Sequence, residues 1–176
     1  MGTTTSSNIR NRPFRSVAEM DARILSNYQA CVRPDDDFWF VGDFGFGETG
    51  GKPDHLERIF KALPGRKHLI IGNHDGERVQ RLGWTSVQPM AEIKDGQYRV
   101  VMCHYPMITW NGARRGALHL FGHVHDTWMG SRNAINVGVD LWDFMPVRID
   151  DIARFGADLP LNKHWHDVEP GTGQTD

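Results

Sequence analysis

The stretch FWFVGDF, residues 38–44, gives the first strong indication of the fold. Its leading residues are apolar and Gly42 follows at once, so the run is too short for a helix and indicates a buried strand. HLIIGNHD, at 68–75, changes from apolar to polar residues in the same way. Between the two, Pro53 is well placed to begin a helix that runs to about Leu63. This order of elements predicts an α/β domain.

The same reasoning extends outward along the chain. Ser16 and Glu19 form a capping-box pattern, and apolar residues at helical spacing predict a helix over 16–32. We expect a short helix at 77–82, a hairpin turning at Asp95-Gly96, and strands at 117–123, 134–139 and 146–149. The sequence therefore predicts one domain, residues 1–160, in which 1–10 are flexible. Residues 161–176 are expected to form a disordered polar tail.

The bulk composition is ordinary for a globular protein. The 176 residues carry 24% charged side chains and a formal net charge of −2. No long run of Lys and Arg occurs, so nucleic acid is not indicated as a partner. No apolar segment reaches the roughly 20 residues of a membrane helix. The two cysteines lie in no C-x-x-C pair, which favours a reduced, cytoplasmic protein. Oligomeric state leaves no readable pattern.

Polar residues of one chemical kind follow several strands. Taken singly, Asp43 and Asn73 are ordinary turn residues, and His104 could be a packed histidine. His123 and His125 are two residues apart, which on a continuing strand turns both imidazoles to one face. Together, these oxygen and nitrogen donors at strand ends indicate a site for a divalent ion such as Mn, Fe, Zn or Ni.

In order and spacing, the motifs GDF, GNHD, CHYP and GHVH resemble those of the calcineurin-like metallophosphoesterases. The wider strings HYPMITWNG, HLFGHVH and INVGVD are similar to those of small bacterial and phage members of that family. The resemblance covers roughly residues 8 to 155. It implies a fold of two mixed β-sheets packed together with flanking helices.

The resemblance also implies roles for individual residues. Asp43 would bridge two metal ions, and His125 would bind the first of them. The second ion would be held by Asp43 together with Asn73, His104 and His123. His74 would protonate the leaving oxygen or stabilise charge on the phosphoryl group, while Asp75 orients its imidazole.

Two arginines are candidate substrate-binding residues on the basis of residue type alone. Arg114 and Arg115 lie in NGARRG, between the motifs of His104 and His123. Guanidinium groups match phosphate oxygens bidentately, so either arginine could bind the substrate. A solvated basic turn is an equally good interpretation.

One departure from the family pattern leaves alternatives open. The family begins with a strand that ends in Asp-x-His, and this chain has no such pair before Asp43. The first strand is therefore missing or altered. Either the sequence starts too late, or the protein binds one metal ion in place of two, or the fold serves as a non-catalytic metal-binding or interaction scaffold.

We expect an enzyme that uses metal-activated hydroxide. It would hydrolyse a phosphomonoester or phosphodiester in a phosphorylated small molecule or nucleotide. The divalent ion that assists it, for which manganese is one candidate, is expected to be bound by the same set of donors.

Overall fold

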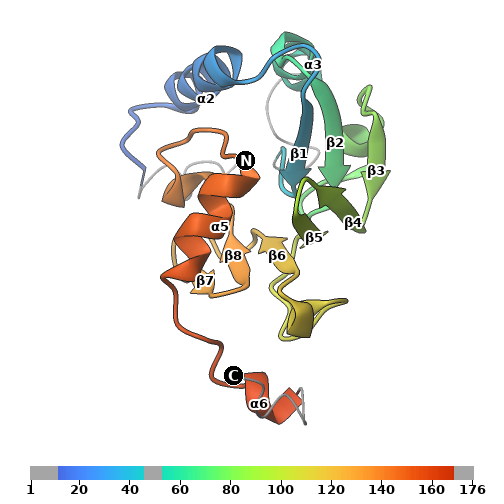
Figure 1. Ribbon diagram of the computed structural model, residues 1–176. Helices are drawn as coiled ribbons and strands as arrows, with labels where there is room; N and C mark the ends of the chain where they lie inside the picture. The colour runs from blue at the N-terminus through green and yellow to red at the C-terminus, as the bar shows by residue number, and fades with distance from the viewer. Residues whose placement is uncertain (1–11, 46–52, 169–176) are drawn as a thin grey trace.

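The chain folds into two β-sheets with helices at their sides (Figure 1). The computed structural model describes residues 12–45 and 53–168. The helices α2 (Val17–Cys31) and α3 (Pro53–Ala62) lie together beside the first sheet, and α5 (Ile149–Ala157) lies against the second. The predicted α/β fold is confirmed.

The first sheet is entirely parallel. Its strands are β1 (Asp37–Val41), β2 (Arg66–Ile70) and β3 (Ser86–Gln88), which pair in that order. Helix α3 connects β1 to β2, and the short helix α4 (Glu77–Gln80) lies between β2 and β3. The strand–helix–strand prediction is confirmed, although this sheet is not mixed.

The second sheet is mixed. Its central strands β5, β6 and β8 are parallel, whereas the outer strands β4 and β7 run antiparallel to their neighbours. The order is β4 (Met90–Asp95), β5 (Tyr98–Cys103), β6 (Leu118–Phe121), β8 (Ala134–Asn136) and β7 (Gly130–Ser131). The predicted hairpin is confirmed, because β4 and β5 pair from Asp95–Tyr98 onward.

The N-terminal cap of α2 forms much as its sequence predicts. The Ser16 hydroxyl accepts a hydrogen bond from the Glu19 backbone N–H at 3.1 Å. The Glu19 carboxylate accepts from the backbone N–H of Arg15 at 2.8 Å, one residue before the expected partner. Two N–H groups at the start of the chain's first described helix are thereby satisfied.

The strand predicted at 146–149 is wrong. Residues before Ile149 form a loop, and α5 begins at Ile149. Asp150 and Asp151 favour this helix, because acidic groups in a first turn interact well with the helix dipole. Ile152, one turn further on, is buried in the core. The strand predicted at 134–139 is also shorter than expected, since β8 ends at Asn136.

Short helical turns occur in both later loops and in the C-terminal region. They are η1 (Ala113–Arg115), η2 (Val139–Leu141) and α6 (Trp165–Val168). Helix α6 lies in the segment expected to be a disordered tail, and its Trp165 ring is 6.3 Å from that of Trp110. The expected flexible residues 1–10 lie outside the described part of the chain.

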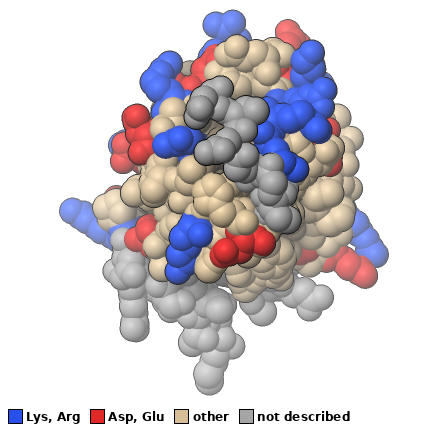
Figure 2. Space-filling view, turned by 60° about the horizontal axis from the view of Figure 1, so that its bottom comes forward, with Lys and Arg blue, Asp and Glu red and all other residues tan. Residues whose placement is uncertain are grey.

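The hydrophobic core joins the two sheets. Ile70 from β2 packs with Met102, Leu120 and Ile135 from the second sheet, and Ile152 covers them from α5. None of the helices in the described part of the chain is both long and apolar enough to span a membrane. On the face shown in Figure 2, basic and acidic side chains are interspersed around a broad area of uncharged residues.

Candidate metal centre

The loops after β1 and β2 approach each other closely at two glycines. Gly42 has a φ of 88°, and a Cβ there would collide with the His104 imidazole. A Cβ on Gly72 would collide with the Asp43 side chain. Asp43 itself has a φ of 57°, a conformation that few residues other than glycine adopt. The close approach brings Asp43 and Asn73 together from two neighbouring strands.

Asp75 holds these two loops in place. Its carboxylate accepts hydrogen bonds from the backbone N–H groups of Gly72 and Asp43, both at 2.8 Å, and of Phe44 at 2.9 Å. Burial raises the pKa of the Asp75 carboxyl, while the N–H groups of Gly72 and Asp43 oppose that rise. The resemblance implied that Asp75 orients His74; bonding the backbone of both loops is a role that the sequence did not predict.

Four predicted ligands are joined by a series of close contacts. The Asn73 carbonyl oxygen Oδ1 lies 3.0 Å from His104 Nε2 and 2.9 Å from His123 Nδ1. Asp43 Oδ2 lies 3.4 Å from the same His104 nitrogen. We call Asp43, Asn73, His104 and His123 the ligand cluster.

The hydrogen bonding of His104 fixes what its inner nitrogen can do. His104 is buried, and its Nδ1 lies 2.9 Å from the Val41 carbonyl oxygen. A carbonyl only accepts, so Nδ1 carries the proton, and in the neutral ring Nε2 is then a bare acceptor. That acceptor faces the oxygens of Asn73 and Asp43. A positive charge, either a second proton on His104 or a cation among the donors, satisfies this arrangement, and so does an Asn73 amide turned so that its NH₂ group donates to Nε2.

The pKa values of His104 and Asp43 reflect the attraction between a protonated imidazole and the carboxylate. Burial opposes the charged form of His104, but the Asp43 carboxylate and the Val41 carbonyl raise its pKa above the usual value. Burial likewise opposes the charged form of Asp43, whose pKa is lowered by His104 and by the backbone N–H of His74. A divalent cation would satisfy the same electrostatic requirement as the proton.

The chemistry of the donor set suits a divalent ion. A carboxylate oxygen, an amide oxygen and two imidazole nitrogens are the ligand types that borderline metals prefer. Within residues 12–45 and 53–168, however, no three His, Cys, Asp or Glu side chains form a metal-binding group by themselves. The cluster depends on the amide oxygen of Asn73, which links the two histidines.

The described side-chain contact of His125 is with a carboxylate outside the ligand cluster. Strand β6 ends at Phe121, and both His123 and His125 have positive φ values, 66° and 50°. The expectation that a continuing strand carries both imidazoles is therefore wrong. His125 Nδ1 lies 3.8 Å from Asp140, whose carboxylate binds the Arg12 guanidinium at 2.6 and 2.8 Å.

The other predicted site residues are placed differently. His74 is half-buried beside the cluster, and its backbone N–H donates to Asp43 Oδ1 at 3.0 Å. Arg114 and Arg115 lie in η1 and do not line the cavity that contains the cluster's Asp43, His104 and His123. Their binding of substrate stays a prediction.

Two further residues shape the site without having been predicted. The Asn136 amide donates to the backbone carbonyls of His125 at 2.6 Å and Trp128 at 2.8 Å, so it fixes the loop that follows β6. The Tyr105 ring is 46% exposed and lies 4.7 Å from the ring of His123. Tyr105 directly follows the predicted ligand His104 in the sequence. This position was the signal that could have identified Tyr105.

The close contact at Gly42 leads to a first prediction. We expect Gly42→Ala to displace His104 and to lower the stability by roughly 2 kcal/mol, because the new methyl group adds steric overlap to an unfavourable φ. Urea unfolding measures this loss. Gly76→Ala is the matched control, since a Cβ there meets nothing within 4 Å. Equal midpoints for the two variants would contradict the prediction.

Comparisons with known proteins give relatives without an established activity. No family model matches the chain. It is 28% identical over 185 residues to the Gene 66 protein of Mycobacterium phage L5, covering 87% of this chain and 86% of that protein. An uncharacterized protein of Methanocaldococcus jannaschii, MJ1445, is 26% identical over 153 residues, covering 82% and 79% of the two chains.

Two solved structures are similar to this one. A protein of unknown function from Aquifex aeolicus, AQ665, aligns with a TM-score of 0.67 and 25% identity, over 85% of this chain and 92% of its own. A novel archaeal phosphodiesterase aligns with a TM-score of 0.48 and 14% identity, over 67% and 74%. The second likeness is too weak to carry an argument, whereas the first shows that this chain shares its fold with the Aquifex protein.

Proposed function

We propose that this protein is a metal-dependent phosphoesterase whose ion is held by Asp43, Asn73, His104 and His123. The observation that carries the proposal is the His104 nitrogen Nε2, a bare acceptor in the neutral ring that faces two oxygen acceptors. The motif order, which resembles that of calcineurin-like metallophosphoesterases, supports the same reading. A bound divalent ion would attract phosphate oxygens and acidify water.

The chain's own residues supply the rest of the chemistry. The Val41 carbonyl keeps the His104 proton on Nδ1, so that Nε2 stays directed at the cluster. Asp75 fixes the backbone on both sides of Asp43. A water oxygen attacks phosphorus and gives one proton to solvent, while the bond to the ester oxygen breaks. The half-buried His74 gives its proton to that departing oxygen and takes one back from solvent.

We propose one ion per chain. The ligand cluster offers four donors for it, whereas His125 is near a carboxylate, Asp140, that already binds Arg12. The ion could be Mn, Fe, Zn or Ni, since supply and geometry select among them. The substrate class is a phosphorylated small molecule or nucleotide, as monoester or diester.

The test uses purified protein with Mn²⁺ and two phosphate diesters, bis-p-nitrophenyl phosphate and diphenyl phosphate. We expect metal-stimulated hydrolysis by the wild type. His74→Ala should lower release of the poorer leaving group, phenol, by roughly 100-fold, and release of p-nitrophenol less, because a general acid matters most for a basic leaving oxygen.

His164→Ala is the matched control, because this histidine is 52% exposed on its side chain and pairs locally with Asp167. Metal analysis accompanies the assay. Protein that binds about one ion per chain yet hydrolyses neither diester would favour the non-catalytic scaffold. Protein that binds no ion would refute the proposed metal centre.

A further inference from the structure

His119 is a buried histidine that the proposed chemistry does not use. It lies in β6, and its exposed fraction is 0%. The rings of Trp110 and Phe121 pack against it, with centroids 5.2 and 5.5 Å away. Burial lowers the pKa of the imidazole, although the Val101 and Tyr105 carbonyls oppose that change. The ring is therefore neutral near pH 7, and both of its nitrogens need polar neighbours.

Both nitrogens of His119 meet backbone groups. Nδ1 lies 3.2 Å from the carbonyl oxygen of Val101 in the neighbouring strand β5. Nε2 lies 3.1 Å from the Met107 backbone nitrogen and 3.2 Å from the Tyr105 carbonyl oxygen. A neutral imidazole carries one proton. With that proton on Nδ1, Nε2 accepts from the Met107 N–H; with it on Nε2, the ring donates to the Tyr105 carbonyl. In either tautomer, His119 bonds the loop that follows β5.

This loop begins at His104 and places Tyr105 against the ligand cluster. The Tyr105 ring lies 5.2 Å from the ring of His104 and 4.7 Å from that of His123. His104 is buried and its Nδ1 already bonds Val41, whereas His123 is exposed and lies in a turn with a φ of 66°. An exposed side chain keeps its rotamer only where neighbours restrict it. The Tyr105 ring provides such a restriction for His123.

We propose that His119 and Tyr105 are positioning residues of the metal centre. His119 holds the loop backbone, and the Tyr105 ring holds the His123 imidazole with its Nδ1 toward Asn73, 2.9 Å from the amide oxygen. The inference rests on the proposed function, since it concerns the same ion. Ligands that are held in place beforehand lose less conformational freedom when the ion binds. Both residues therefore raise metal affinity through His123.

The first test compares two amides at position 119. A Gln side chain carries its amide to about the place of Nε2, where it can accept from Met107 or donate to Tyr105. An Asn side chain is shorter by one methylene group, reaches about the place of Nδ1 and leaves the loop without its bond. We expect His119→Asn to lower Mn²⁺ affinity about tenfold or more, and His119→Gln to retain most of it. Calorimetric titration of the full chain measures both affinities.

Fluorine NMR reports the position of Tyr105 without any metal. Fluorotyrosine is incorporated into the full chain, which has three tyrosines, and Tyr105→Phe assigns the signal by removing it. The fluorine shift depends on the neighbouring imidazole rings. We expect the Tyr105 signal to stay near its wild-type position in His119→Gln and to move in His119→Asn, because the loop is released.

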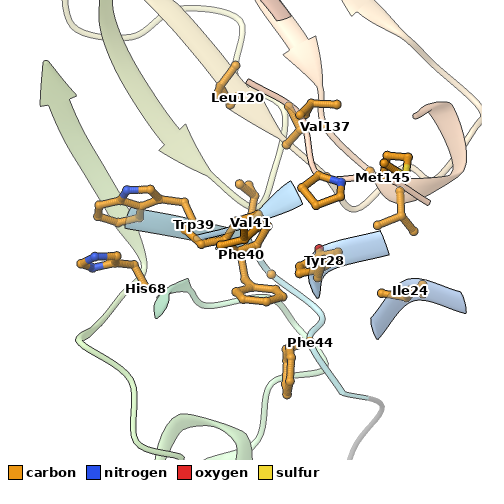
Figure 3. Close-up of a pocket in the computed structure, with 18 of the residues that line it drawn as sticks. Ile24, Tyr28, Trp39, Phe40, Val41, Phe44, His68, Leu120, Val137 and Met145 are labelled. Atoms are coloured by element: carbon orange, nitrogen blue, oxygen red, sulfur yellow. The ribbon is translucent and has the colours of Figure 1, made fainter. Parts of the chain in front are cut away.

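Substitutions at Tyr105, which is exposed, leave the core intact. Tyr105→Phe keeps the ring and should bind Mn²⁺ as the wild type does, whereas Tyr105→Ala should bind it about tenfold more weakly. His68→Asn is the matched control for position 119. Figure 3 shows His68 beside Trp39, at a ring distance of 4.3 Å, and its nitrogens meet Ser86 and Asp37. This control should change neither the Mn²⁺ affinity nor the Tyr105 signal.

The outcomes separate this inference from the proposed function. Equal Mn²⁺ affinities of the wild type and Tyr105→Ala would overturn the inference, and so would equal effects of His119→Gln and His119→Asn on affinity and on the Tyr105 signal. If His119→Asn does not fold, Tyr105→Ala decides alone. A wild type that binds no Mn²⁺ would refute the metal centre itself. In that case the Tyr105 signal alone decides whether His119 holds the loop.

Discussion

Replacing Asn73 with alanine is expected to lower metal affinity and metal-stimulated hydrolysis by about 100-fold or more, since even outer-shell changes at metal sites cost 10–100-fold. The Asn73 oxygen lies 3.0 Å from His104 Nε2 and 2.9 Å from His123 Nδ1, so its loss separates the two imidazoles. Asn73 is exposed, and stability should change by less than about 0.5 kcal/mol. Calorimetric titration with Mn²⁺ and urea unfolding measure the two effects.

Two variants complete that experiment. Asn73→Asp keeps an oxygen donor at the same place and should retain metal binding. Asn111→Ala removes another exposed amide, whose nitrogen bonds Glu92 at 2.8 Å, and should leave metal affinity unchanged. If Asn73→Ala binds Mn²⁺ as the wild type does, the amide is not a ligand and the proposed centre is wrong.

The site residues that directly follow parallel strands were the ones that the sequence could predict. Asp43, Asn73 and His104 follow β1, β2 and β5, and hydrophobic runs locate such strands well. Strands that end at the same edge bring their following residues together. The convergence of Asp43 and Asn73 therefore followed from patterns on the scale of a single strand, whereas His104 follows a strand of the other sheet and meets them through the packing of the two sheets.

Residues whose position depends on local turns could not be predicted in the same way. His123 and His125 have the two-residue spacing of a strand, but positive φ values interrupt the strand that this spacing assumed. The PVRI segment is apolar enough for a strand, yet packing of Ile152 in the core selects a helix from Ile149. In each case tertiary contacts override a weak local preference.

The pairing of Asp140 with Arg12 shows the same limit at long range. The two residues are 128 positions apart, and nothing in either local sequence indicates that they meet. Their ion pair occupies the carboxylate nearest to His125. Our proposal of one metal ion in place of two thus rests on a contact that only the folded chain reveals.

Replacing Asp75 with alanine is expected to destabilise the protein by roughly 3 kcal/mol. Asp75 is only 3% exposed and accepts from three backbone N–H groups, those of Gly72, Asp43 and Phe44. Each buried donor left without an acceptor costs about 1–3 kcal/mol, and entry of water offsets part of that sum. Urea unfolding at pH 7 gives the difference in free energy.

The same substitution should also weaken metal binding, because those hydrogen bonds join the loop of Asp43 to the loop of Asn73. Asp75→Asn keeps one acceptor oxygen but turns a donor toward the N–H groups, so its stability should lie between those of alanine and wild type. Asp126→Ala, at an exposed position, is the matched control and should change stability by less than about 0.5 kcal/mol. If Asp75→Ala is as stable as Asp126→Ala, the carboxylate does not hold the two loops, and the geometry of the ligand cluster must depend on other contacts.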